Sequence, residues 1–121
     1  MSSKKIVVAD DDRVGRELIR EALETSGYEV IEAADGLEAV RRVREAAPDL
    51  VLVDIQMPRL DGYGVLRELR ADPQFSGVRV VAVTAFAMGR DREQAREAGF
   101  DGFITKPVDI ASLRTQIGRF F

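Results

Sequence analysis

The chain has 121 residues, and 18 Lys and Arg against 21 Asp and Glu give it a net charge of −3. This length is typical of one domain, and it is sufficient for a hydrophobic core without covalent cross-links. Because the chain contains neither Cys nor His, disulfides, thiolate and imidazole metal sites, cysteine nucleophiles and Ser-His-Asp triads are excluded.

Five apolar runs are predicted strands, in chain order 6–9, 28–33, 50–53, 78–83 and 102–104. The first, third and fourth runs are continuously apolar, which is typical of strands buried on both faces in a parallel sheet. The second run alternates apolar residues with glutamates. This alternation predicts an edge strand.

An amphipathic segment follows each predicted strand, and we expect its apolar stripe to face the core. The first four segments end at stop signals, which are Gly27, Pro48, Asp72-Pro73 and Gly99. The stripes of the first, second and fifth segments consist of Val14, Leu18, Ile19, Ala22 and Leu23, then Leu37, Val40, Val43 and Ala47, then Ile110, Leu113, Ile117 and Phe120. The alternation predicts an α/β fold, a (βα)5 doubly wound parallel sheet, as a single domain over residues 1–121 without an output domain.

No segment is expected to enter a membrane or to bind nucleic acid. The four apolar residues Ile6–Ala9 are too few for a secretory signal, which needs about 7–15, or for a membrane span, which needs about 20. The acidic net charge and the lack of a helix-turn-helix pattern argue against a nucleic-acid partner. We therefore expect the protein in the cytoplasm.

Polar side chains follow four of the five predicted strands. They are Asp10-Asp11-Asp12 after the first, Asp54 after the third, Thr84-Ala85 after the fourth and Thr105-Lys106-Pro107 after the fifth. The carboxyl ends of parallel strands form one edge of the sheet, where sites in such folds are found. We expect these side chains to meet there.

The acids predict a magnesium site. Asp10, Asp11 and Asp54 would place three carboxylates in one cleft, where like charges need a cation, and hard oxygen ligands suit Mg²⁺. The backbone carbonyl of Gln56 can join them. Asp12 is interpreted as the cap of the following helix. A carboxylate beside Mg²⁺ can also attack phosphorus, and Asp54, at the mouth of the most apolar strand, is the candidate nucleophile.

Lys106 is the only Lys beyond the first five residues of a chain that otherwise uses Arg. Its position predicts a compact ammonium that pairs with Asp54 and then with phosphoryl oxygens. Thr84 can donate its hydroxyl to a phosphoryl oxygen, and Ala85 leaves the mouth of the site open. The Lys106–Pro107 bond is a candidate for a cis peptide.

Four segments together resemble the receiver domain of bacterial two-component response regulators, the family that includes the chemotaxis regulator. They are residues 6–12, 54–62, 83–85 and 98–107, and the resemblance extends from about Lys5 to Phe120. It implies the flavodoxin-like strand order 2-1-3-4-5. The residues that follow Thr84-Ala85 are most similar to those of single-domain regulators and of hybrid-kinase receivers.

The resemblance implies a role for each site residue. Asp54 accepts a phosphoryl group from a phosphohistidine of a histidine kinase or a phosphotransfer protein. Asp11 binds Mg²⁺ directly and Asp10 mostly through water. Thr84 and Lys106 hold the phosphoryl oxygens. Phe103 is the switch aromatic, and the fourth helix, fifth strand and fifth helix form the face that binds a downstream protein.

Two positions depart from the family pattern. The switch aromatic Phe103 has no hydroxyl. Phe86 is apolar, and together with Ala85 it borders the access to the phosphoryl group. Our hypothesis is that Phe86 shields the acyl phosphate from water. Phe86→Glu should then speed its hydrolysis, and an unchanged decay rate would reject the idea.

Other functions remain open on the residues alone. Asp10–Val14 fits the motif of haloacid-dehalogenase-like phosphatases, but that reading leaves Asp54 unexplained. A flavin carrier of the same fold would place a phosphate near three acids, which would repel it. A pseudo-receiver, an interaction module that takes no phosphate, is the third alternative. The resemblance implies no enzyme in the ordinary sense, only Mg²⁺-dependent self-phosphorylation and slow self-dephosphorylation.

Overall fold

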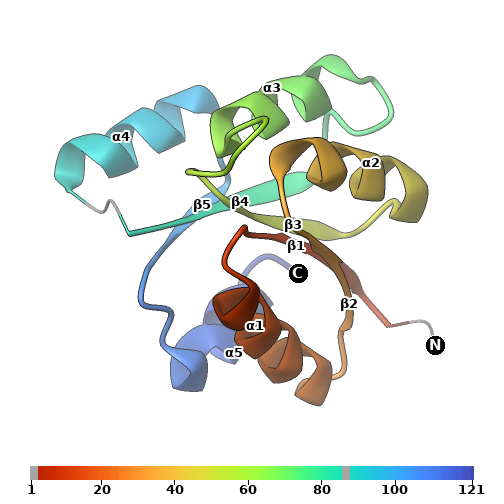
Figure 1. The fold of residues 1–121 in the computed structure, drawn as a ribbon, viewed down its shortest axis with the longest axis vertical. Coiled ribbons are helices and arrows are strands. Elements are labelled where there is room, and N and C mark those ends of the chain that lie inside the picture. Colours follow the sequence, from red (N-terminus) through yellow and green to blue (C-terminus); the bar gives the residue numbers. More distant parts are fainter. Residues whose placement is uncertain (1–2, 86–87) are drawn as a thin grey trace.

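The computed structural model describes residues 3–85 and 88–121, and strands alternate with helices along the chain (Figure 1). The strands are β1 (Lys5–Ala9), β2 (Glu29–Ala33), β3 (Leu50–Asp54), β4 (Arg79–Thr84) and β5 (Gly102–Thr105). The helices are α1 (Arg13–Thr25), α2 (Gly36–Ala46), α3 (Gly62–Ala71), α4 (Gly89–Ala98) and α5 (Ile110–Gly118).

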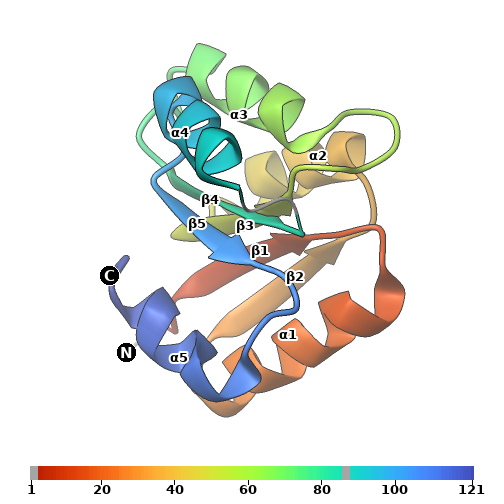
Figure 2. The ribbon, with the colours of Figure 1, turned by 90° about the vertical axis from the view of Figure 1, so that its left-hand side faces the viewer.

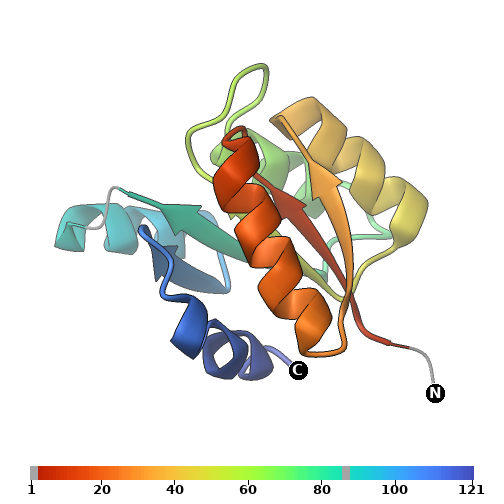
Figure 3. The ribbon, with the colours of Figure 1, turned by 60° about the horizontal axis from the view of Figure 1, so that its bottom comes forward.

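The five strands form one parallel sheet in the order β2-β1-β3-β4-β5. Helices α1 and α5 cover one face, and α2, α3 and α4 cover the other (Figures 1 and 2). Figure 3 shows α1 in front of the sheet, with α5 beside its lower end. The predicted fold and strand order are confirmed, and β2 is an edge strand as predicted.

The sheet separates two hydrophobic clusters, and β3 contributes to both. Its residues Leu50 and Leu52 belong to the cluster under α1 and α5, whereas Val51 and Val53 belong to the cluster under the other three helices. Every residue of β3 is buried. Successive side chains of a strand point to opposite faces, so a continuously apolar run is what a central strand of this sheet requires.

Aspartates cap the helices that begin at the carboxyl edge of the sheet. The side chain of Asp35 accepts from the backbone N–H of Glu38, and that of Asp61 accepts from Gly64, both at 2.8 Å. Asp12 occupies the N-cap position of α1, but its side chain makes no capping hydrogen bond. The predicted position of this cap is therefore confirmed, whereas the hydrogen bond that motivated it is absent.

Five residues of the predicted core stripes are exposed instead. They are Val14 (67%), Leu18 (51%), Leu37 (54%), Ile110 (41%) and Ala47, which caps the C-terminus of α2. Val14, Leu37 and Ile110 lie in the first turns of their helices, which begin beyond the carboxyl ends of the strands and so have no sheet beneath them. Leu18 and Ile110 line a cavity of about 420 Å³ between α1 and α5. In the described part of the chain, no helix is long and apolar enough to cross a membrane.

Candidate functional site

The carboxyl edge of the sheet brings the predicted residues together. Asp10 follows β1, Asp54 and Thr84 are the last residues of β3 and β4, and Lys106 follows β5. The parallel register aligns these ends, since Asp54 lies opposite Val83 and Thr84 opposite Thr105. Four polar side chains therefore share one rim because four adjacent strands end at the same level.

The three predicted metal-ligating aspartates are close enough to hold one cation. Carboxylate oxygens of Asp10, Asp11 and Asp54 all lie within 4.8 Å of one another. Asp10 and Asp54 are buried, whereas Asp11 is exposed. Oxygen donors of this charge and spacing, with one side open to water, fit Mg²⁺, which takes a few carboxylates and keeps several waters.

Lys106 binds two of the acids. Its Nζ lies 2.6 Å from Oδ2 of Asp54 and 2.8 Å from Oδ2 of Asp10. The pairing with Asp54 is as predicted, whereas the contact with Asp10 was not anticipated from the sequence. The Lys106–Pro107 peptide bond is cis, as the sequence suggested.

Burial and neighbouring charge shift the pKa values of the pair. Burial raises the pKa of the Asp54 carboxyl, and hydrogen bonds from Lys106 and from the Gln56 backbone only partly offset it. Burial acts to lower the pKa of the Lys106 ammonium, but its bonds to Asp10 and Asp54 outweigh this and raise it. Lys106 therefore stays charged at neutral pH and holds together two acids that repel each other.

Backbone N–H groups orient the two buried carboxylates. The N–H of Gln56 donates to Oδ1 of Asp54 at 3.0 Å, and the N–H of Asp12 donates to Oδ1 of Asp10 at 2.9 Å. Each acid thus has one oxygen fixed by the chain and the other on Lys106. Gln56 itself is exposed and lines, with Asp11, an open hollow of about 640 Å³ through which the rim can be reached.

Gly62 allows the chain to pass close behind Asp54. A Cβ atom at this position would lie 2.8 Å from the backbone oxygen of Asp54 and 2.8 Å from Cα of Ile55. The N–H of Gly62 donates to the Ile55 carbonyl at 2.8 Å, which seats the start of α3 against the end of β3. Close packing therefore requires a glycine directly after Asp61, at the start of α3.

The predicted phosphoryl-contacting and access residues lie at the end of β4. Thr84 is buried, and Ala85 directly after it is exposed. The backbone N–H of Lys106 donates to the Thr84 carbonyl at 2.8 Å, so the two residues are held next to each other. Phe86, the other predicted access residue, lies outside the described residues.

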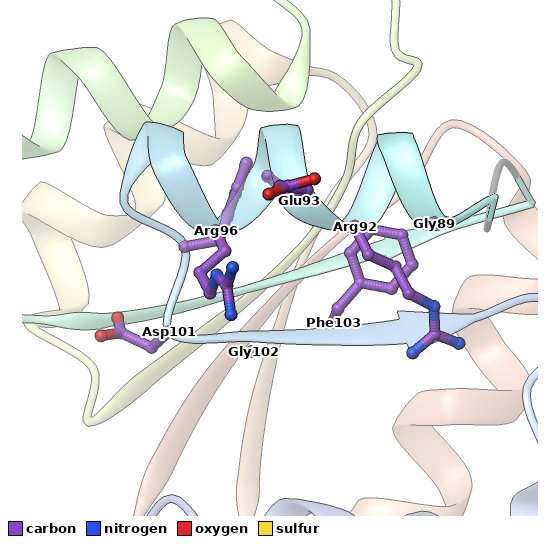
Figure 4. Close-up of a pocket in the computed structure, with 9 residues that line it drawn as sticks. Gly89, Arg92, Glu93, Arg96, Asp101, Gly102 and Phe103 are labelled. Carbon is purple, nitrogen blue, oxygen red and sulfur yellow. The ribbon is translucent and has the colours of Figure 1, made fainter.

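Phe103, the predicted switch aromatic, projects from β5 toward α4 (Figure 4). It is half-buried and lines a cavity of about 480 Å³ together with Arg92 and Arg96. The guanidinium of Arg92 lies over its ring, and Phe103 also packs against the core cluster under α2, α3 and α4. The aromatic ring is thus between the core and solvent.

Two residues next to the rim were missed by the sequence analysis. Arg16 on α1 donates a hydrogen bond to the backbone oxygen of Asp10. The carboxylate of Glu32 on β2 accepts a second hydrogen bond from the same guanidinium. The alternation of apolar residues with glutamates in β2 predicts an edge strand but indicates no partner for Glu32. A carboxylate and a guanidinium 16 residues apart carry no local pattern that would pair them.

Fold and site together define a class of protein: a parallel (βα)5 domain with a cluster of acids and one lysine at the carboxyl edge of its sheet. The family model of the response regulator receiver domain matches residues 6–118. The chain therefore belongs to the response regulator receiver domain family. Members of this family work with kinases and downstream proteins in two-component signalling, and bind Mg²⁺ in the acidic pocket.

Curated relatives and solved structures agree with this assignment. The polar-differentiation response regulator DivK of Brucella anthropi is 40% identical over 107 residues, which cover 88% of this chain and 87% of that protein. The DivK of Brucella ovis is 40% identical over 108 residues, or 89% of this chain and 88% of that protein.

Two solved structures illustrate the structural likeness. The chemotaxis response regulator CheY4 of Vibrio cholerae superposes with a TM-score of 0.93 at 25% identity, covering 99% of this chain and 100% of that one. The receiver domain of the sensor histidine kinase PA1611 of Pseudomonas aeruginosa has a TM-score of 0.89 at 34% identity, covering 98% of each chain. The PA1611 structure holds a magnesium ion in its active-site cleft.

Proposed function

We propose that this chain is a phosphorelay receiver that accepts a phosphoryl group on Asp54. The observation that carries the proposal is the position of this carboxylate. Asp54 is buried at the end of the central strand, 2.6 Å from the Lys106 ammonium and among acids whose oxygens lie within 4.8 Å. One cleft thus contains the nucleophile Asp54, the Lys106 ammonium that can attract phosphoryl oxygens, and the acids that can hold a cation.

The transfer is a substitution at phosphorus. A carboxylate oxygen of Asp54 supplies the electron pair for the new P–O bond while the P–N bond to a donor imidazole breaks. The imidazole nitrogen keeps the electrons of the broken bond and takes up a proton. Because these 121 residues contain no His, the phosphohistidine lies outside them, on a histidine kinase or a histidine phosphotransfer protein.

Lys106 and Thr84 are the residues we assign to the transferred oxygens. Lys106 is released from its bond to Asp54 when Asp54 becomes an acyl phosphate, and its ammonium then faces the phosphoryl group. Asp10, Asp11, Asp54 and the carbonyl of Gln56 are the proposed ligands of Mg²⁺, which when bound would neutralise charge on the phosphoryl oxygens. The chain catalyses only its own phosphorylation and its slow reversal.

The signal would leave through the face formed by α4, β5 and α5. Phosphorylation adds charge and acceptor oxygens beside Thr84 and Lys106. If Thr84 moves toward them, Phe103 can turn inward, since it already contacts the core beneath α4. The face would then bind a downstream protein in one of its two arrangements. Histidine kinases take their phosphoryl group from ATP, and we therefore propose that this protein acts in the cytoplasm.

The test is phosphorylation by a small donor. Purified protein is mixed with Mg²⁺ and acetyl phosphate, and its intact mass is recorded with and without EDTA. We expect one phosphoryl group, sensitive to hydroxylamine as an acyl phosphate, and lost in Asp54→Asn and in EDTA. The Asp61→Asn variant serves as a matched control, because Asp61 caps α3 outside the cluster of acids.

Two results would overturn the proposal. A phosphoryl group found on the Asp54→Asn variant would show that another residue is the one modified. Failure to take phosphate from acetyl phosphate and from a phosphorylated histidine phosphotransfer protein, while Mg²⁺ binds, would identify a pseudo-receiver instead. Turnover of a small phosphate ester such as p-nitrophenyl phosphate would favour the phosphatase alternative.

A further inference from the structure

The acidic loop after β1 is held by a side chain that belongs to neither the acids nor the lysine. Nη1 of Arg16 donates to the backbone oxygen of Asp10 at 2.7 Å, and Nε of the same guanidinium donates to Oε1 of Glu32 at 2.7 Å. Arg16 lies in α1 and Glu32 in β2. One planar group therefore links the helix, the edge strand and the first residue of the loop.

This bridge is well shielded from water. The side chains of Arg16 and Glu32 are 14% and 23% exposed. The carboxylate of Glu32 also accepts a hydrogen bond from Nη1 of Arg20, which lies one helical turn further along α1. Burial alone raises the pKa of Glu32, but the hydrogen bonds and charges of the two arginines outweigh it and lower the pKa. Glu32 is thus an anion that holds Arg16 in one orientation.

The bond to the Asp10 carbonyl orients the next residue. A peptide group is planar, so fixing the Asp10 oxygen also fixes the N–H and Cα of Asp11. The N–H of Asp10 is held in turn by the Ala33 carbonyl at 3.0 Å. The Asp11 carboxylate is exposed and receives no hydrogen bond within the described part of the chain. Its direction therefore depends on the peptide that Arg16 holds.

Arg16 and Arg20 differ in what they hold in place, although both belong to this cluster. Both bind Glu32 and so tie α1 to β2, but of the two, within the described residues, Arg16 alone also contacts the loop. A guanidinium can do this because its N–H donors form a rigid planar fork, which an ammonium lacks. If the cluster served stability alone, replacing either arginine would leave Mg²⁺ binding unchanged.

We propose that Arg16 is a positioning residue for the cation site, acting through the Asp10–Asp11 peptide and anchored by Glu32. The inference rests on the proposed function, in which Asp10 and Asp11 hold Mg²⁺. Residues outside the ligand shell that orient the ligands commonly change metal affinity by about 10–100-fold. Arg16 would do so without touching the ion.

The test compares Arg16→Met with Arg20→Met in the full chain. Mg²⁺ affinity is measured by isothermal titration calorimetry without any phosphodonor, and the midpoint of thermal unfolding is recorded in EDTA. We expect Arg16→Met to weaken Mg²⁺ binding about tenfold. Arg20→Met loses a bond to the same Glu32, and we expect it to lower the unfolding midpoint while leaving the Mg²⁺ affinity within about twofold of wild type.

A kinetic measurement separates positioning from damage to the catalytic groups. Phosphorylation by acetyl phosphate is followed as a function of Mg²⁺ concentration. In Arg16→Met we expect the half-saturating concentration to rise about tenfold, in proportion to the weaker binding, and the limiting rate to stay within about twofold of wild type. Should Arg16→Met not fold, Glu32→Gln replaces it, because it removes the anchor of Arg16, and we expect it also to weaken Mg²⁺ binding.

The results divide cleanly. Equal Mg²⁺ affinities in wild type and Arg16→Met, or equal weakening in both arginine variants, would overturn the inference and leave Arg16 a structural link. If wild type binds Mg²⁺ but takes no phosphate, the proposed function fails, while the affinities of the two variants still decide the role of Arg16.

Discussion

The guanidinium of Arg92 lies over the ring of Phe103, with Cζ 5.2 Å from the ring centroid. Nη2 of Arg92 also donates to Oγ1 of Thr105 at 3.1 Å. Both partners belong to β5, so one side chain ties the first turns of α4 to the strand beside it. Any inward turn of Phe103 must give up the contact with Arg92.

Replacing Arg92 should free Phe103. In Arg92→Met we expect a loss of about 1 kcal/mol in the free energy of unfolding, from one exposed cation–π contact and one exposed hydrogen bond. Urea unfolding measures this loss, and the NMR linewidths of the Phe103 ring report its mobility. Arg96→Met is the control, because Arg96 lines the same cavity. Equal effects in the two variants would contradict a specific role for Arg92.

Lys106 should be needed for stability mainly when Mg²⁺ is absent. Lys106→Met leaves Asp10 and Asp54 buried side by side without their counter-charge, at a cost of about 2 kcal/mol in EDTA. A bound cation compensates for that repulsion, so Mg²⁺ should raise the unfolding midpoint of Lys106→Met more than that of wild type. Lys4→Met is the surface control, because Lys4 is exposed. An equal effect of Mg²⁺ on all three proteins would refute the prediction.

Asp54 should make the metal-free protein less stable as the pH rises. Its folded-state pKa is raised, chiefly by burial. Its contribution to stability is therefore fully present below the unfolded pKa, near 4, and is lost as the pH rises through the folded value. In EDTA we expect Asp54→Asn to be more stable than wild type at pH 7, with the difference vanishing in acid. Urea unfolding across this pH range measures it.

Glu32 should show the opposite pH dependence. Its folded-state pKa is lowered by Arg16 and Arg20 despite burial. Its contribution to stability is present above the unfolded pKa and is lost as the pH falls through the folded value. We therefore expect Glu32→Gln to be less stable than wild type at pH 7, and equally stable in strong acid. A deficit that is constant with pH would point to lost packing rather than lost charge.

Gly62→Ala should affect the site as well as the fold. The added methyl group would lie 2.8 Å from the Asp54 oxygen, so the end of β3 or the start of α3 must shift. We expect a loss of about 1–3 kcal/mol in stability, together with weaker Mg²⁺ binding. At Gly77 a methyl group meets nothing within 4 Å, and Gly77→Ala is expected to leave both properties near wild type. Calorimetry with Mg²⁺ and urea unfolding test the pair.

The alternation of strands and helices, the edge strand β2 and the rim that carries the site could all be predicted from the sequence. A central strand buried on both faces must be continuously apolar, and β3 is. The first polar residue after such a run must lie at the mouth of the sheet, which placed Asp54 correctly. Lys106 was placed by its position at the end of the fifth predicted strand. These inferences succeed because they depend on periods of two and 3.6 residues and on where a run stops, all of which are local.

Which side chains meet across the sheet could not be predicted from the sequence and follows from the folded arrangement. The second bond of Lys106, to Asp10, depends on β1 and β5 lying on either side of β3 and β4. The bridge of Arg16 between Glu32 and the Asp10 carbonyl depends on how α1 crosses β1 and β2. The exposure of Leu18 depends on the distance between α1 and α5. Each is set by the packing of elements distant in sequence, and a one-dimensional pattern does not contain those distances.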